Sequence, residues 1–278
     1  MEAYTDFSMV YDTFMDDTPY QEWADFLAEL IEKYGVSRKK HDMDVTSTGE
    51  NPIKSGKLDS ERDLVLDLGC GTGTLTELLH QKGYDMLGVD NSQEMLNVAL
   101  SKKERSGSDI LYLCQDMRKL DLYSTVGTVL SVCDSINYLL EAEEVEETFS
   151  LVNNYLYPGG IFIFDFNTVY KYEQVIGDTT IAENRDECSF IWENFYHEEE
   201  RINEYDLTIF VKKEESDLFG RFTETHFQRG YTLEEMKNYV KRAGMEVVLV
   251  LDADTRKAPI DESERIYVVA KECIKPRR

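Results

Sequence analysis

Three glycines at alternate positions form the part of this sequence best suited to bind a ligand. The apolar run 64–68, which contains Asp67, leads directly into Gly69, Gly71 and Gly73, and leucines at helical spacing follow. Because glycine has no side chain, the backbone can turn sharply there, and a ligand can lie against bare main chain beside a helix N-terminus. The spacing therefore predicts a binding loop between a strand and a helix.

The spacing of the glycines also excludes two common nucleotide sites. In the dinucleotide fingerprint G-x-G-x-x-G the third glycine stands one residue later, where this chain has Thr74. A nicotinamide enzyme is therefore a remote alternative. No Lys-Ser or Lys-Thr pair follows the loop, so it is not a P-loop.

The loop must be positioned by neighbouring strands and helices, and the sequence predicts these in alternation. Short apolar strands are expected at Leu64–Leu68, Met86–Val89, Ile110–Leu113, Thr128–Cys133 and Ile161–Phe166, with amphipathic helices between them. Strands separated by helices form βαβ units, in which a parallel sheet is covered on both faces. The fold class predicted is α/β.

The pattern changes after residue 170. Strands are expected at 188–196, 203–213 and 219–230 without helices between them, which indicates an antiparallel meander. Thr232 and Glu235 have the spacing of a capping box and predict a new helix, followed by strands at 246–251 and 265–270.

These elements predict a domain organisation in four parts. They are an N-terminal helical segment (1–36), a polar loop insertion (37–61), an α/β core (62–170 and 231–278) and a β-rich cap (171–230).

The pattern D-x-G-x-G-x-G that begins at Asp67 resembles motif I of the class I S-adenosylmethionine-dependent methyltransferases. Three further stations of that family follow in order: Asp90 after the second strand, the segment 114–117 after the third, and the L-x-P-G-G turn at 156–160. The resemblance covers about residues 60–170. It implies a Rossmann-like sheet of seven mostly parallel strands with one antiparallel edge partner, and an antiparallel β cap inserted after strand five.

The resemblance also implies the cofactor, S-adenosyl-L-methionine, and its product, S-adenosyl-L-homocysteine. Asp90 is expected to bind both ribose hydroxyls, and Asp116 with the backbone of Met117 to bind the adenine edge. Asp90 could instead cap a helix, and Asp116 could be a turn residue. The cofactor-binding residues expected in the core are Asp67, Gly69, Cys70, Gly71, Gly73, Asp90, Asn91, Asp116, Met117 and Cys133.

The aromatic residues of segment 4–23 resemble the opening helices of bacterial small-molecule methyltransferases, a subgroup that includes sugar N,N-dimethyltransferases. In that subgroup the N-terminal helices fold over the cofactor, which implies that Tyr11 and Tyr20 lie near its methionine end. The same aromatic spacing would equally suit a helix face packed on the core.

The methyl acceptor is expected beyond the carboxyl ends of the fourth and fifth strands, where open α/β sheets bind ligands. The polar candidates for catalysis there are Asp134 and Asn137. His226 is a third, because strand alternation places it on one face with Glu224 and Gln228; that face either lines a pocket or meets water. Cys133 is interpreted as an inert buried thiol and not as a nucleophile.

No metal site is expected, because the four histidines are scattered along the chain. The net charge of −25, from 55 acidic and 30 basic residues, argues against nucleic acid and anionic membranes as partners. No apolar run is long enough to span a membrane. Five widely spaced cysteines and no signal sequence favour a cytoplasmic protein.

The function favoured by the sequence is methylation of a small soluble metabolite at nitrogen or oxygen. The alternatives are a protein or RNA methyltransferase, and a catalytically silent protein that binds the cofactor without turnover. The sequence leaves the acceptor and the oligomeric state open.

Overall fold

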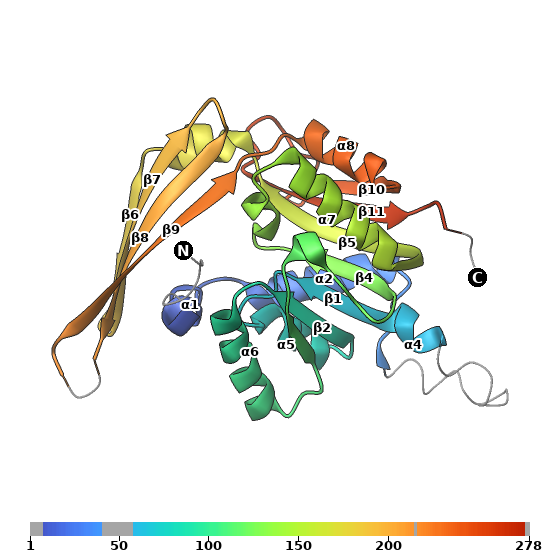
Figure 1. The fold of residues 1–278 in the computed structure, drawn as a ribbon, viewed down its shortest axis with the longest axis horizontal. Helices are drawn as coiled ribbons and strands as arrows, with labels where there is room; N and C mark the ends of the chain where they lie inside the picture. The colour runs from blue at the N-terminus through green and yellow to red at the C-terminus, as the bar shows by residue number, and fades with distance from the viewer. Residues whose placement is uncertain (1–7, 41–57, 214–215, 276–278) are drawn as a thin grey trace.

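Two β-sheets with helices packed around the larger one make up the computed structural model, which describes residues 8–40, 58–213 and 216–275 (Figure 1). The larger sheet has the strand order β10-β11-β5-β4-β1-β2-β3. Its strands are β1 (Leu64–Leu68), β2 (Asp85–Asp90), β3 (Leu111–Cys114), β4 (Val126–Ser131), β5 (Leu156–Asn167), β10 (Met245–Asp252) and β11 (Arg265–Glu272).

The five strands β1 to β5 run parallel, as the sequence predicts. Strand β11 is antiparallel to both β5 and β10 and lies between them, so the antiparallel strand is next to the edge and not the edge partner that was expected. This placement buries β11 almost completely, in agreement with its apolar run 266–270.

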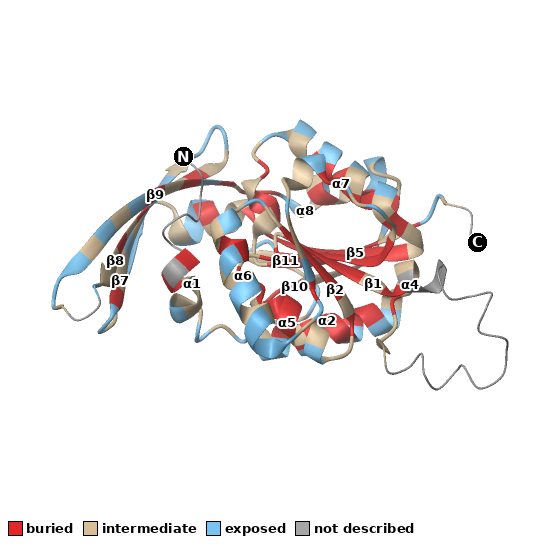
Figure 2. Cartoon of the chain, turned by 60° about the horizontal axis from the view of Figure 1, so that its bottom comes forward, coloured by how far each residue is buried: buried red, intermediate tan, exposed pale blue. Residues whose placement is uncertain are grey.

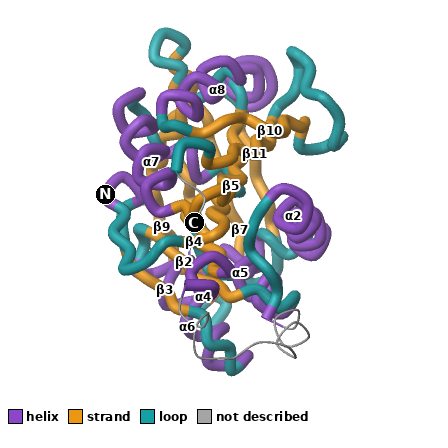
Figure 3. Tube along the Cα trace, turned by 90° about the vertical axis from the view of Figure 1, so that its right-hand side faces the viewer, coloured by secondary structure: helices purple, strands orange, loops and turns teal. Residues whose placement is uncertain are grey.

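Helices cover both faces of the larger sheet. The helices α2 (Tyr20–Tyr34) and α5 (Thr74–Gln81) share a core cluster with one face, and α7 (Ala142–Tyr155) and α8 (Leu233–Arg242) with the other. Figure 3 shows α2 and α7 on opposite sides of the strands. Helix α6 (Gln93–Ser106) lies against β2 and β3, and α4 (Leu58–Asp63) precedes β1. Within the described ranges no helix is long and apolar enough to cross a membrane.

The N-terminal segment contains two helices within the described residues, α1 (Ser8–Phe14) and α2. Pro19, which has no N–H to continue a helix, stands directly before α2. The predicted turn at 156–160 is part of β5, where the pairing with β4 shifts register between Val126 and Thr128. Most of the predicted loop insertion, residues 41–57, lies outside the described residues.

The second sheet is antiparallel and has the order β6-β7-β8-β9. Its strands are β6 (Thr180–Asn184), which the sequence did not predict, β7 (Cys188–His197), β8 (Ile202–Lys212) and β9 (Phe219–Arg229); the π-helix η3 (Lys171–Ile176) precedes them. Val10 and Phe14 of α1 pack against its buried face. Figure 2 shows that this sheet projects from the core and carries many exposed residues.

Asn137 joins the two sheets. It lies in the short helix η2 (Ser135–Tyr138), and its amide donates to the carbonyls of Asn167 (2.9 Å) and Arg229 (2.7 Å). Its oxygen accepts from the N–H of Asn167 at 2.8 Å. The side chain is fully buried, so these bonds tie η2 to the ends of β5 and β9 without competition from water.

The substitution Asn137→Ala should lower the free energy of unfolding by about 3 kcal/mol, because three backbone groups each lose a hydrogen bond at the junction of the sheets. Urea denaturation measures this loss. The matched control is Asn154→Ala, at an exposed position of α7. An equal and small effect of the two substitutions would show that Asn137 does not hold the sheets together.

Candidate functional site

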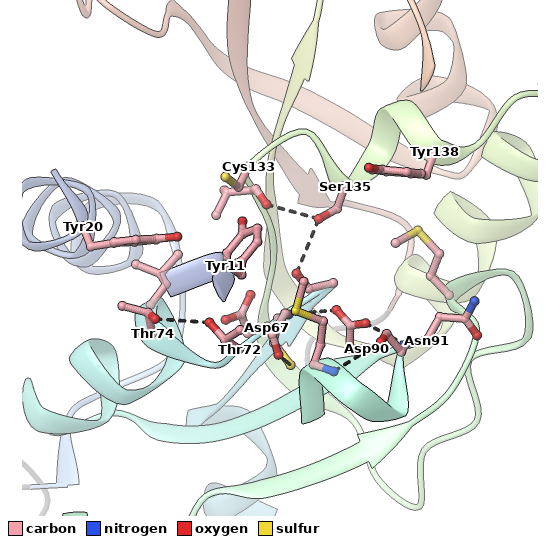
Figure 4. Close-up of a pocket in the computed structure, with 18 of the residues that line it drawn as sticks. Tyr11, Tyr20, Asp67, Thr72, Thr74, Asp90, Asn91, Cys133, Ser135 and Tyr138 are labelled. Carbon is pink, nitrogen blue, oxygen red and sulfur yellow. Dashed lines mark hydrogen bonds between the residues drawn. The ribbon is translucent and has the colours of Figure 1, made fainter. Parts of the chain in front are cut away.

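A pocket lies at the carboxyl ends of β1, β2 and β4, below the N-terminal helices. Figure 4 shows Tyr20 and Tyr138 on opposite sides of it, with Tyr11 between them. The lining residues are Tyr11, Tyr20, Trp23, Asp67, Gly69, Cys70, Gly71, Thr72, Thr74, Leu75, Asp90, Asn91, Ser92, Met95, Met117, Val132, Cys133, Ser135 and Tyr138. Residues far apart in the sequence, predicted separately to contact one ligand, thus line a single pocket.

Two of the predicted residues lie beside this pocket. Asp116 lines a smaller adjoining pocket together with Asn91 and Met117. Its carboxylate accepts from Arg118 (Nε–Oδ1 2.9 Å), and this hydrogen bond lowers the pKa of Asp116. Gly73 stands at the start of α5 with φ +74°, and a Cβ there would lie 2.5 Å from the Tyr112 hydroxyl. Gly73 therefore permits the close packing of the loop and does not line the pocket.

Gly71 provides the open surface of the loop. Its φ is +54°, and a Cβ built on it would meet no atom within 4 Å. The backbone at this point faces empty space, as a cradle for a ligand requires.

Asp90 supports the loop from the end of β2. Its Oδ2 accepts from the N–H of Gly71 at 2.8 Å, and its Oδ1 accepts from the N–H of Ser92 at 2.8 Å. The side-chain cap of α6 is Ser92, which accepts from the N–H of Met95, so capping is not the role of Asp90. A carboxylate can accept about four hydrogen bonds, so Asp90 keeps acceptor capacity for a ligand.

Asp67 adds a second carboxylate to the pocket. Thr76 donates to it at 2.6 Å, and burial, with a smaller contribution from the charge of Asp90, raises the pKa of Asp67 to about 6. Among the described residues that line this pocket there is no lysine or arginine. The pocket is therefore suited to a cationic ligand.

The turn after β4 has an unusual backbone. Cys133 and Asp134 have φ values of +66° and +57°, in the left-handed region. Their N–H groups donate to the carboxylate of Asp165 at 3.1 and 2.9 Å, and Arg265 lies 3.7 Å from that fully buried carboxylate. Burial raises the pKa of the Cys133 thiol to about 12, so the group stays a neutral thiol and not the nucleophilic thiolate.

The three predicted catalytic residues lie at different places. The Asp134 carboxylate accepts from Gln228 at 3.0 Å and from Asn167 at 3.2 Å, and is partly exposed. Asn137 is outside the pocket lining, and its amide bonds the backbone as described above. His226 is 1% exposed, lies outside the pocket lining and contacts Tyr138, which is part of that lining.

The sequence did not single out Asp12. Its carboxylate accepts from Thr72 (2.7 Å) and Thr74 (3.2 Å) of the glycine loop and pairs with Lys102 of α6 at 2.6 Å. These contacts hold α1 against the loop. No local pattern could have revealed them, because the partners are 60 to 90 residues away in the chain.

The pocket fits the cofactor that the motifs imply. Asp90 has acceptor positions for a pair of hydroxyls, the face of Gly71 is open, and the carboxylates of Asp67 and Asp90 match a positive charge. Asn91, Asp116 and Met117 extend this lining into the adjoining pocket.

Comparison with known proteins agrees with this geometry. Residues 65–160 match the family model described as a methyltransferase domain. A putative methyltransferase of Geobacillus sp. (strain WCH70) is 32% identical over 269 residues, which are 97% of this chain and 99% of that protein.

Solved structures with the same fold are also methyltransferases. An S-adenosylmethionine-dependent methyltransferase from Clostridium acetobutylicum ATCC 824 aligns with a TM-score of 0.79 and 29% identity, over 98% of this chain and 99% of that one. An amino pentose methyltransferase from Micromonospora echinaspora shares the fold with a TM-score of 0.67 and 18% identity, over 95% of this chain and 97% of that one. The chain therefore belongs to the class I S-adenosylmethionine-dependent methyltransferases.

Proposed function

We propose that this methyltransferase acts on a nitrogen or oxygen atom of a small metabolite. The observation that carries the proposal is the pocket itself, which is lined by the aromatic side chains Tyr11, Tyr20 and Trp23 of the N-terminal helices together with the glycine loop. Bound S-adenosylmethionine supplies an activated methyl group. The residues of the chain then need to align the acceptor and exclude water.

The lining residues are proposed to divide the cofactor between them. Asp90 binds the ribose hydroxyls, and Asp116 with the N–H of Met117 binds the adenine edge. Asp67, Tyr11 and Tyr20 lie around the methionine end, and the other predicted loop residues and Cys133 form the wall. Asn137, which is held by backbone groups, supports the acceptor side instead of reacting there.

We favour an amine as the acceptor, because the charged side chains that line the pocket are carboxylates. Asp134 is a partly exposed carboxylate at the end of β4, next to Cys133 of the pocket wall. An anionic acceptor would find no basic residue among the described residues that line the pocket. The amino pentose substrate class of the structural neighbour from Micromonospora agrees with this choice.

The rival functions fit the structure less well. An RNA substrate would need basic residues, whereas the chain carries a net charge of −25. A protein substrate would need an open groove at a site that here lies beside a projecting second sheet. A cytoplasmic location is also proposed, because all five cysteines are free thiols.

Incubation with methyl-labelled S-adenosylmethionine and a fractionated bacterial metabolite extract tests the proposal. Label should pass to a low-molecular-weight amine or alcohol. Label that appeared only in RNA or protein would refute the small-molecule acceptor, and binding of the cofactor without any transfer would identify a silent binding protein.

Asp90→Asn should weaken binding of S-adenosylhomocysteine about 100-fold, because hydrogen bonds to a charged acceptor contribute roughly 1.5–3 kcal/mol each. Titration calorimetry measures the affinity. Asp85→Asn, at the opposite end of β2, is the matched control and should bind normally. Unchanged affinity of the Asp90 variant would reject the ribose role.

The preference for S-adenosylmethionine over S-adenosylhomocysteine should rise with pH. Asp67 is neutral below its raised pKa of about 6 and negative above it. The Asp67 carboxylate therefore attracts the positively charged sulfonium only at the higher pH. Between pH 5 and pH 7.5 the ratio of the two dissociation constants should change about tenfold. Asp67→Asn should make the ratio independent of pH, and a ratio that is already flat in the unaltered protein would contradict the assignment.

A further inference from the structure

A buried row of polar side chains leads from the pocket wall into the second sheet. The hydroxyl of Tyr138, which lines the pocket, lies 3.2 Å from Nδ1 of His226. Nε2 of His226 lies 3.2 Å from Oε2 of Glu224. His226 and Glu224 are 1% and 6% exposed, so a proton placed on the imidazole is shielded from water.

The contacts of His226 determine which nitrogen carries its proton. An ionised carboxylate can only accept a hydrogen bond, so with Glu224 ionised Nε2 is the donor and Nδ1 keeps the lone pair that faces Tyr138. The imidazole stacks on the ring of Tyr205, with centroids 4.8 Å apart and planes 8° from parallel. The Tyr205 hydroxyl lies 2.7 Å from that of Tyr138. The imidazole is thus fixed in one orientation.

A general base needs a fixed imidazole whose lone pair faces the proton it will accept, whereas a histidine that only fills the core does not. Tyr138 comes from η2, directly after β4, and the Asn137 bonds hold that helix against β9, which carries both His226 and Glu224. A basic nitrogen of the second sheet is thereby connected to the pocket through a single hydroxyl.

We propose that Tyr138, His226 and Glu224 remove the proton that the acceptor loses on methylation, an inference that rests on the proposed function. The acceptor atom forms a bond to the methyl carbon, the carbon–sulfur bond breaks, and its electron pair stays on sulfur. The proton leaves the acceptor for the oxygen of Tyr138 as the proton of Tyr138 moves to Nδ1 of His226. The resulting imidazolium is stabilised by Glu224 and later releases its proton to water. Tyr138 is the catalytic residue, and the other two act through it.

The relay has a definite pH dependence. A protonated His226 has no lone pair for the proton of Tyr138, so the turnover rate should fall as the pH drops. Titratable groups that contact the imidazole include Tyr138 of η2, Tyr205 of β8 and Glu224 of its own strand. Glu224 stabilises the imidazolium that forms during turnover, and its removal should therefore lower kcat.

The experiment measures kcat and the KM for the acceptor from pH 5 to 9, with labelled S-adenosylmethionine and the metabolite fraction that accepts label. His226→Gln should lower kcat about 100-fold and abolish the acidic limb, since general base catalysis contributes roughly 10²–10⁴. Tyr138→Phe should lower kcat to a similar extent, and Glu224→Gln should lower it to a smaller extent. His197→Gln is the matched control, because His197 pairs with Glu204 at 2.9 Å on the exposed part of the same sheet.

Thermal unfolding and binding of S-adenosylhomocysteine establish that each variant is folded with an intact cofactor site. Variants that bind normally but keep the unaltered kcat and acidic limb would overturn the relay and leave the proposed function standing. A rise in KM alone would assign these residues to acceptor binding and would also overturn it. Absence of labelled product with the unaltered protein would refute the proposed function itself, and the relay with it.

Discussion

The carboxylate of Asp165 holds the turn on which both sides of the site depend. It accepts the N–H groups of Cys133 and Asp134, two residues without the freedom of glycine in the left-handed region. Each such conformation costs of order 1 kcal/mol or more and persists only where the surroundings impose it. Arg265 beside the buried carboxylate keeps that charge compensated, and its guanidinium lies over the ring of Trp23 at 4.9 Å. One buried ion pair thus connects the turn after β4 with the helix that walls the pocket.

The turn after β4 directs its side chains to two different places. Cys133 and Ser135 face the pocket, whereas Asp134 and Asn137 reach Asn167, Gln228 and the end of β9. The second sheet is therefore bonded to the core on the side proposed above for the acceptor. This arrangement explains why polar residues of β9, which would be unfavourable in an isolated sheet, are buried here with partners.

Local patterns were sufficient to predict the core of the fold. The glycine loop, the strand ends at Asp90 and Asp116, and the capping box of Thr232 and Glu235 each depend on residues a few positions apart. The placement of β11 inside the sheet and the strand β6 were not predicted, because pairing partners are chosen by contacts between distant segments.

The site shows the same division between local and distant information. Eleven of the twelve residues expected around the cofactor line the two adjoining pockets, and most of these follow the carboxyl ends of predicted strands; Gly73 is the exception. The network of Asp12 with Thr72 and Lys102, and the contact of Tyr138 with His226, join segments separated by 30 to 90 residues. Only the folded chain reveals them.

Helix α1 has a position with a mechanical consequence. This helix of seven residues carries Tyr11 in the pocket wall, Asp12 on the glycine loop, and Val10 and Phe14 on the second sheet. A displacement of α1 would therefore disturb three places at once: the wall of the pocket, the glycine loop and the apolar cover of the second sheet. The pocket and the second sheet are thus mechanically connected through one short helix.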